Sequence, residues 1–352
     1  MRITLAYRDR SFEAAPDQSL LDAALDASLN LPHSCKGGSC GACRARLLQG
    51  EIHYPNGPPL GLSESEIRDG LMLMCQARAR SDLTLETFEI AAPEDIVTKR
   101  LPARIDRIEP LSHDVMGVHL RLPAAEEFRF KAGQYLDIML SGGRRRSFSI
   151  ASPPHEARTL ELHVRRVAGG EFSERLFRDG AEGSLLSIEG PLGQFLYRDA
   201  PAGRPMLMVG GGTGLAPLLC IIKHVLHERL ERDMRLYWGV RAERDLYADQ
   251  ALLDLERQMA QTAGARLTYV PVLSEGSVEW RGARGLVHEA VLADFSDFAG
   301  CDVYTAGPPA MVAAVRRELA ARGTDAERIF FDSFDYAPDS AARQSINAAS
   351  KD

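Results

Sequence analysis

The stretch Cys35-Lys36-Gly37-Gly38-Ser39-Cys40-Gly41-Ala42-Cys43 decides the fold of the first part of this chain. It places three cysteines close together, and a fourth, Cys75, follows at a distance. The chain has 6 cysteines among 352 residues, which is too few for a disulfide scaffold, yet four of them crowd into its first quarter. Such crowding favours thiolates that bind a metal or a cluster in a reducing compartment.

The spacing of these cysteines indicates one kind of cluster. C-x4-C-x2-C followed by a distant cysteine is the ligand pattern of plant-type [2Fe–2S] centres. Two irons need four thiolates, and the glycines of the loop let the backbone bend around them. The alternative is a structural zinc site or chance, but zinc sites usually use a second close cysteine pair. We therefore predict that Cys35, Cys40, Cys43 and Cys75 bind a [2Fe–2S] cluster.

Composition and charge exclude several classes of function. The chain is 45% hydrophobic and 26% charged, which is ordinary for a globular protein, and its length predicts two or three domains. A formal charge of −7 without a long basic run gives no electrostatic support for nucleic-acid binding. Arg8, Asp9 and Arg10 interrupt the apolar stretch that a secretory signal needs, so we expect a cytoplasmic protein.

The uncharged run Pro205–Ile222 is nearly as long as a membrane span. Four glycines lie in its middle, however, and Pro217 follows them. Because glycines at this density would break a membrane helix, we predict a buried strand, a turn and a helix, and no membrane contact.

The spacing of apolar residues divides the chain into segments. They are a small α+β unit at 1–92, a linker at 93–102, an antiparallel barrel or sandwich at 103–200, a parallel sheet with alternating helices at 201–336, and a frayed tail at 337–352. Ser19 and Ser63 predict two short helices in the first segment, the second with a capping box. In the parallel-sheet segment, helices are predicted over Leu215–Leu230, Ala248–Met259 and Met311–Ala321.

Two motifs of the third segment suit a flavin nucleotide. In Arg146-Ser147-Phe148-Ser149, a guanidinium that can hold a phosphate lies beside an aromatic face and a hydroxyl. In His163–Ser173, a double glycine precedes a short helix whose amides suit a pyrophosphate, with Ser173 assisting. Taken alone, the arginine run at 144–146 is more often a solvated surface, and the double glycine is more often a plain turn.

The loop Gly210–Pro217 lies between a predicted buried strand and a helix, where a parallel sheet binds phosphates. It is neither G-x-G-x-x-G nor a P-loop, and a tight strand–helix turn explains it equally well. Arg241, Glu243 and Arg244 follow the next strand. Arginines suit a 2′-phosphate and acids suit a free ribose, so NADH and NADPH both stay open.

Together these motifs resemble one family, in which a plant-type ferredoxin domain is fused ahead of a ferredoxin–NADP reductase-like module. The chain is similar to the reductase components of bacterial aromatic-ring oxygenases and to CDP-6-deoxy-glucoseen reductase-like proteins, over about residues 1–336. The resemblance implies a β-grasp [2Fe–2S] domain at 1–92, an FAD-binding β-barrel domain at 103–200 and an NAD(P)-binding α/β domain at 201–336.

The resemblance also assigns roles to single residues. Those implied to bind FAD are Arg146, Phe148, Ser149, Gly169, Gly170 and Ser173, and His163, Val164 and Arg165, at the start of the second flavin motif, are also predicted to bind a cofactor. Those implied to bind the nicotinamide cofactor are Gly211, Gly212, Thr213, Gly214, Pro217, Arg241, Gly307 and Pro308. The family's terminal acidic-x-aromatic element falls on Asp332 and Phe334, whose ring is expected to cover the flavin, while Ser149 and Asp332 adjust flavin protonation.

Two features depart from the family. Its usual Cys-Gly-Pro reads Ala306-Gly307-Pro308 here, which predicts slower or differently ordered hydride transfer. Many relatives end at the aromatic residue that corresponds to Phe334, so the residues after it must turn away if the ring is to stack on the flavin.

These parts imply an electron relay. Nicotinamide gives two electrons as a hydride, which a one-electron cluster cannot accept, so a flavin must stand between them. We predict an NAD(P)H-dependent reductase that passes electrons through FAD and the cluster to a terminal Rieske-type oxygenase. The alternatives are a sugar-deoxygenating dehydrase as partner, or an electron-carrier module with impaired hydride transfer. We expect a monomer that docks its partner weakly, by electrostatic contacts near the exposed loop Lys36–Ser39.

Overall fold

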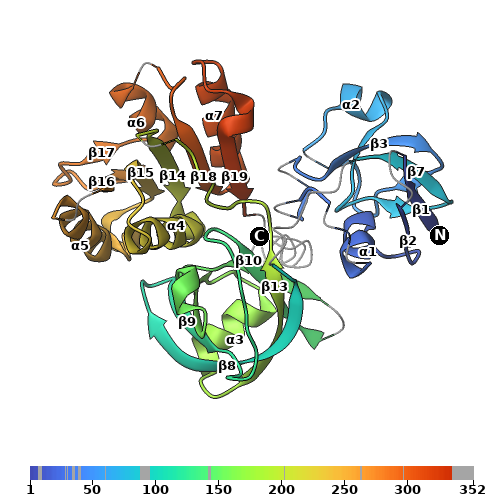
Figure 1. The fold of residues 1–352 in the computed structure, drawn as a ribbon, viewed down its shortest axis with the longest axis horizontal. Coiled ribbons are helices and arrows are strands. Elements are labelled where there is room, and N and C mark those ends of the chain that lie inside the picture. The colour runs from blue at the N-terminus through green and yellow to red at the C-terminus, as the bar shows by residue number, and fades with distance from the viewer. Residues whose placement is uncertain are drawn as a thin grey trace, which may run out of the picture. The chain divides into compact units, whose positions relative to one another are not determined.

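The computed structural model describes residues 1–6, 10–27, 29, 31–33, 36–38, 41–59, 61–87, 96–141, 144–201, 203–261, 264–295 and 297–334. They form two compact units, Met1–Ile96 and a second that begins at Val97 (Figure 1). Cys35, Ser39, Cys40, residues 93–95 and the predicted tail 337–352 lie outside the described residues. Within the described ranges, no helix has the length and apolar character needed to cross a bilayer.

The first unit is built on a five-stranded sheet with the order β2-β1-β7-β3-β5. Its elements are β1 (Arg2–Leu5), β2 (Arg10–Glu13), α1 (Leu20–Asp26), β3 (Arg44–Gln49), β4 (Ile52–His53), α2 (Glu64–Arg68), β5 (Leu71–Leu73), β6 (Arg78–Ala79) and β7 (Leu83–Glu86). Ile3 and Leu5 alternate with outward residues on β1 and share a core with Leu21 of α1. A sheet with a parallel central pair, β1 and β7, and a helix packed on its core fits the β-grasp fold expected for this segment.

Both helix starts predicted in this unit are confirmed. The Ser19 hydroxyl accepts a hydrogen bond from the Asp22 amide at 3.0 Å. Ser63 and Glu66 form the capping box, since the Ser63 amide donates to Glu66 Oε2 at 2.7 Å and the Glu66 amide donates to Ser63 Oγ at 3.3 Å. The capped helix α2 leads directly into β5, the strand that ends just before Cys75.

The second unit begins with a six-stranded antiparallel barrel of order β11-β10-β13-β8-β9-β12. Its elements are β8 (Lys99–Pro110), β9 (Val115–Arg121), β10 (Tyr135–Met139), β11 (Arg145–Ser149), η2 (Pro154–Glu156), β12 (Thr159–Arg165), α3 (Glu171–Asp179) and β13 (Leu185–Leu192). The predicted linker at 93–102 is too long, because β8 already begins at Lys99. Its first residues are mostly charged, and only the alternating burial of Leu101, Ala103 and Ile105 reveals a strand.

A parallel sheet of order β17-β16-β15-β14-β18-β19 completes the second unit. Its elements are β14 (Met206–Gly211), η3 (Gly212–Gly214), α4 (Leu215–His227), β15 (Asp233–Val240), η4 (Glu243–Asp245), α5 (Asp249–Ala260), β16 (Arg266–Leu273), β17 (Ala283–Arg284), α6 (Val287–Asp294), β18 (Asp302–Gly307), α7 (Pro309–Ala320), η5 (Ala326–Arg328) and β19 (Ile329–Ser333). Helices α4 and α5 cover one face of the sheet, and α6 and α7 cover the other (Figure 1). The strand, turn and helix predicted for Pro205–Ile222 are confirmed as β14, η3 and α4.

The barrel and the parallel sheet share one continuous core. Ile138 and Leu162 of the barrel belong to the same apolar cluster as Leu218, Ile221 and Trp238 of the sheet and its helix α4. A Cβ on Gly133 of the barrel would lie 3.2 Å from the Ile221 side chain. Packing therefore holds the barrel and the parallel sheet in a fixed relation. The change in the spacing of apolar residues near residue 200 does not reveal this.

Two histidines stack where the barrel meets α4. The rings of His155, in η2, and His227, the last residue of α4, are 3.5 Å apart and inclined by 12°. Glu156 and Glu228 face them at 3.8 and 4.0 Å, and His224 and Lys223 lie nearby on α4. Burial lowers the pKa of His155, and the charge of His227 lowers it further. The native state thus binds fewer protons than the unfolded chain, so stability is lost as pH falls below about 6.5.

Replacing His227 by Gln should make the protein less sensitive to acid. We expect the wild-type melting temperature to fall more between about pH 7.5 and about pH 5.5 than that of the H227Q variant, because the variant cannot place two positive rings together. Thermal unfolding at the two pH values measures this. The variant H288Q, which changes a histidine of α6 outside the stack, is the control and should match the wild type. If the melting temperatures of H227Q and the wild type fell equally, the histidine stack would not be the cause of the acid sensitivity.

Candidate functional site

Two of the four predicted cluster cysteines lie among the described residues, and the first sheet brings them together. Cys43 precedes β3, Cys75 follows β5, and the two strands are antiparallel with Arg44 opposite Leu73. The Met74 amide donates to the Cys43 carbonyl at 3.0 Å. Both cysteine side chains are buried. Two thiol groups that are distant in sequence thus meet at one end of the sheet.

Tyr54 lies beside this cysteine pair. Burial raises the pKa of Tyr54, a hydrogen bond from the Leu73 amide opposes this, and the charges of Cys43 and Cys75 raise it further. Both sulfurs therefore lie within electrostatic reach of one tyrosine. Cys220, by contrast, lies inside α4, and burial raises its pKa to about 12, as suits the ordinary thiol that the sequence suggests.

The described part of the cysteine loop has the backbone that a tight wrap requires. Lys36, Gly38 and Gly41 have φ of 52°, 85° and 74°, in the left-handed region. Gln76 Nε2 donates to the Lys36 carbonyl at 2.8 Å and lies 3.9 Å from Cys75 Sγ. Lys36 is half-buried and Gly38 is buried, so the loop is less exposed than predicted.

The predicted flavin motif lies on β11, and strand alternation divides its residues between two faces. Arg146 and Phe148 share one face, where the Phe148 ring is 5.5 Å from the ring of Phe172 in α3. Ser149 is buried, and its hydroxyl donates to Asp332 Oδ2 at 3.2 Å. Because Asp332 belongs to β19, this bond joins the flavin motif directly to the parallel sheet.

The neighbouring arginines do not form the solvated run that is the simpler explanation of the sequence. Arg144 forms an ion pair with Glu171 of α3. Arg145 forms an ion pair with Glu189 and lies 3.7 Å from the buried Asp137. These pairs tie the end of β11 to α3 and β13, and so hold the motif in place.

The double glycine forms a tight turn into α3. Gly169 has a φ of 74°, and a Cβ on Gly170 would lie 2.7 Å from Ser173 Oγ and 2.9 Å from the Val167 carbonyl. The Ser173 hydroxyl accepts a hydrogen bond from the Val167 amide at 3.1 Å. No side chain caps the N-terminus of α3. The turn therefore leaves helix amides that suit an anionic group.

Strand β12 carries His163, Val164 and Arg165, and successive side chains lie on opposite faces of the strand. Val164 is fully buried in the barrel core. His163 faces the parallel-sheet part, where its Nδ1 lies 3.0 Å from the Tyr247 hydroxyl and its Nε2 lies 3.1 Å from Glu161. Burial alone would raise the pKa of Glu161, but His163 and Lys223 lower it to about 2. Both ring nitrogens of His163 are thus engaged at the junction of the barrel and the parallel sheet.

The glycine loop after β14 packs against the end of β18. A Cβ on Gly214 would lie 2.0 Å from the Ala306 carbonyl, and one on Gly211 would lie 2.8 Å from Pro308 Cδ. Gly307 has a φ of 145°, and its carbonyl accepts a hydrogen bond from the Phe334 amide at 2.9 Å. Thr213 is half-buried in this loop and Pro217 is buried in the first turn of α4. The glycine loop, Gly307 and Phe334 therefore lie together in a close backbone packing, here called the glycine cradle, which a side chain at Gly211 or Gly214 would disrupt.

Position 306, where the family usually has cysteine, lies at this junction. Ala306 is fully buried and lies opposite Asp332 in the register of β18 and β19. Asp332 in turn accepts the Ser149 hydrogen bond. The departure from the family thus falls beside the place where flavin and nicotinamide elements meet.

Arg165 and Arg241 converge on Asp114, which belongs to none of the sequence motifs. A Cβ on Gly212 would lie 2.7 Å from Arg165 Nη1, so the guanidinium lies over the glycine loop. Both arginines form ion pairs with Asp114, which lies between β8 and β9. For Arg165, the sequence did offer a signal. Side chains alternate along β12, so residues 161, 163 and 165 lie on one face of the strand.

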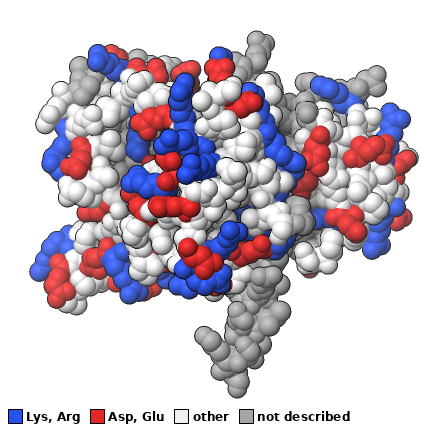
Figure 2. Space-filling view, turned by 90° about the horizontal axis from the view of Figure 1, so that it is seen from below, with Lys and Arg blue, Asp and Glu red and all other residues white. Residues whose placement is uncertain are grey.

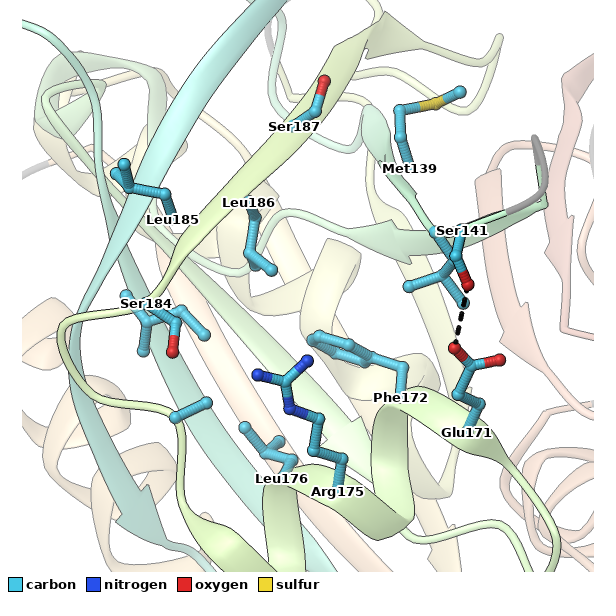
Figure 3. Close-up of a pocket in the computed structure, with 13 residues that line it drawn as sticks. Met139, Ser141, Glu171, Phe172, Arg175, Leu176, Ser184, Leu185, Leu186 and Ser187 are labelled. Carbon is cyan, nitrogen blue, oxygen red and sulfur yellow. Dashed lines mark hydrogen bonds between the residues drawn. The ribbon is translucent and has the colours of Figure 1, made fainter.

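A pocket of about 230 Å³ opens beside α3 (Figure 3). Phe172 and Leu186 form its apolar wall, and Ser141, Glu171 and Arg175 supply polar groups. The Ser141 hydroxyl donates to Glu171 at 3.4 Å. The pocket therefore adjoins the turn that carries Gly169 and Gly170.

Comparison with protein families covers most of the chain. Residues 3–80 match the 2Fe-2S iron-sulfur cluster binding domain, residues 102–197 the oxidoreductase FAD-binding domain and residues 208–317 the oxidoreductase NAD-binding domain. These matches agree with the order of cofactor sites predicted from the motifs.

Similar full-length proteins are known. The CDP-6-deoxy-L-threo-D-glycero-4-hexulose-3-dehydrase reductase of Yersinia pestis is 35% identical over 92% of this chain and 95% of its own. Reductase component 1 of the terephthalate 1,2-dioxygenase of a Comamonas species is 33% identical over 94% and 96% of the two chains. The crystal structure of a cytochrome P450 reductase of Amycolatopsis superimposes with a TM-score of 0.77 and 34% identity, over 95% of this chain and 98% of that one.

Proposed function

The chain belongs to the family of NAD(P)H-dependent reductases that join a [2Fe–2S] domain to FAD- and NAD-binding domains and pass electrons to a partner, and we propose that its partner is a terminal Rieske-type oxygenase. When bound, FAD supplies the change from a two-electron donor to single electrons, and the cluster supplies one-electron transfer. The likeness to reductase components of oxygenases over nearly the whole chain carries the proposal about the partner. The hydrogen bond from Ser149 to Asp332 supports the electron path, because it joins the flavin motif to the end of the nicotinamide sheet.

We propose that FAD lies along the face of β11 formed by Arg146 and Phe148. The uncapped N-terminus of α3, after Gly169 and Gly170, then receives the pyrophosphate. The pocket beside α3 suits the adenosine end, because it places an apolar wall and serines next to that terminus. Ser149, Asp332 and Phe334 surround the opposite end, where the Ser149 hydroxyl donates to the Asp332 carboxylate, which thereby holds the orientation of Ser149.

The nicotinamide cofactor lies across the glycine cradle in this proposal. The loop Gly211–Gly214 meets the pyrophosphate, and Gly307 lets a flat ring approach the backbone next to Asp332. Pro308 packs against Gly211 at one side of the cradle, and Pro217 is buried in the first turn of α4, which follows the loop. The chain supplies orientation and exclusion of water, and hydride transfer needs no side-chain acid or base.

We propose weak electrostatic docking of the acceptor near the cysteine loop, by a monomer in the cytoplasm. Acidic residues outnumber basic ones in residues 1–96, which suits an acceptor with a basic face. On the face drawn in Figure 2, basic and acidic side chains are interspersed, without one continuous patch of either sign. Reduction of the acceptor should therefore slow as salt increases.

The experiment that tests the acceptor compares two purified partners. The reconstituted chain, with FAD, cluster and NAD(P)H, is mixed anaerobically with a Rieske-type oxygenase component or with a CDP-6-deoxyhexulose dehydrase. We expect faster reduction of the oxygenase centre, with bleaching of the flavin before it. Preferential reduction of the dehydrase would support the alternative partner, which relatives such as the Yersinia reductase favour. Absence of flavin bleaching would leave only an electron carrier with impaired hydride transfer.

A further inference from the structure

We propose that Asp114 is a positioning residue for the nicotinamide cofactor, because it holds the Arg165 guanidinium over the glycine loop and ties it to Arg241. The proposal rests on the reductase activity of the chain and not on the identity of its acceptor. Asp114 belongs to the barrel, in the turn between β8 and β9, and lies outside every motif found in the sequence. It would extend the nicotinamide site from the parallel sheet onto the barrel.

The turn holds Asp114 firmly. The Ser112 hydroxyl donates to Asp114 Oδ1 at 3.1 Å, and the Arg166 amide donates to the Asp114 carbonyl at 2.8 Å. The side chain is largely buried, at 19% exposed. Asp114 Oδ2 is therefore fixed in position before it contacts either arginine.

This oxygen meets one arginine from each side of the junction. Arg165 Nε of β12 lies 3.3 Å from Asp114 Oδ2, and Arg241 Nη2, after β15, lies 3.5 Å from the same oxygen. Arg241 Nε also lies 3.5 Å from Asp245 Oδ2. The carboxylate lies beside the Nε edge of the Arg165 guanidinium as an ion pair without a hydrogen bond, and Nη1 lies close to Gly212.

The place where Arg165 lies is the place where a dinucleotide phosphate is expected. Gly212 has a φ of 54° and begins η3, which leads into α4. The Gly212 carbonyl is turned inward, since it accepts a hydrogen bond from Trp238 Nε1 at 2.9 Å. The loop amides are left for an anion, and a planar guanidinium beside them adds a bidentate phosphate donor. In this proposal Arg165, which the sequence assigns to cofactor binding, serves the nicotinamide cofactor.

A metal ion is a poorer explanation of the same cluster. His113, Asp114 and Asp245 present ligand atoms within 4.8 Å of one another. Arg165 and Arg241, however, already contact the two carboxylates, and their positive charges would repel a cation. The cluster therefore suits the orientation of arginines toward an anion.

The test replaces Asp114 by Asn and follows NAD(P)H oxidation with ferricyanide, so that the acceptor partner is not involved. Without the carboxylate, two like charges near one oxygen separate, and Arg165 leaves the loop. We expect KM for NAD(P)H to rise about tenfold, the loss of one charge-assisted contact, while kcat changes little. D114E, which keeps the charge, should recover part of the affinity, and R165K should resemble D114N because it lacks the planar fork.

The matched control is Asp106→Asn. Asp106 pairs with Arg121 on the same barrel and has no contact with Arg165 or Arg241 in the described structure. We expect its KM to match the wild type. If Asp114 acted only as a nearby negative charge, D114N would lower KM for the anionic cofactor, and that result would overturn the proposal. A loss of bound FAD with unchanged KM would overturn it as well, since Arg165 would then serve the flavin.

Discussion

Replacing Cys75 by Ser should abolish reduction of cytochrome c by NAD(P)H and leave reduction of ferricyanide largely intact. Serine offers oxygen in place of the soft thiolate that iron–sulfur clusters require, so the centre loses one of its four ligands. The flavin and nicotinamide elements belong to the second compact unit, which begins at Val97 and does not include Cys75. Ferricyanide can take electrons at the flavin, whereas cytochrome c receives them through the cluster.

The two assays with the same protein preparation measure this prediction, together with its iron and FAD content. Cys301→Ser is the control, because Cys301 is a half-buried thiol outside the first unit and should change neither assay. Iron content should fall in C75S while FAD content is retained. Equal loss of both activities, with FAD still bound, would contradict the proposed order of electron transfer.

Replacing Gly212 by Ala should raise KM for NAD(P)H strongly, by about tenfold or more. Two causes add together. Alanine is strained at a φ of 54°, and its Cβ would lie 2.7 Å from Arg165 Nη1, so the guanidinium must move. The loop amides and the arginine that faces them are then both displaced.

Gly180→Ala separates strain from crowding. Gly180, at the end of α3, has a φ of 60°, close to that of Gly212, and a Cβ there would have no neighbour within 4 Å. We expect G180A to lower the melting temperature slightly and to leave KM unchanged. Steady-state kinetics with ferricyanide and thermal unfolding of both variants provide the comparison. An unchanged KM in G212A would show that the glycine loop does not receive the cofactor.

The local motifs were readable without a structure because their function lies in backbone geometry over a few residues. The glycines at 211, 212 and 214 let the loop pack against Pro308, Arg165 and Ala306, where a side chain would collide. The turn at Gly169 and Gly170 leads into an uncapped helix. The capping residues Ser19 and Ser63 likewise act on amides three positions away. The elements β8 and α6 were not predicted from the sequence. The first residues of β8 are mostly charged, and the apolar residues of α6 show no strong helical period.

The sequence by itself determined the kinds of cofactor and the order of their sites, because cysteine spacing and glycine-rich turns encode them within short segments. Tertiary structure decided which of the predicted site residues lie together. His163 and Arg165 share one face of β12, and only the packing of the barrel against the parallel sheet directs the first to Tyr247 and the second to Gly212. The same packing brings Ser149 to Asp332 and Asp114 to Arg241. Contacts between residues so distant in the sequence depend on how the two sheets pack together, and no local sequence pattern indicates that packing.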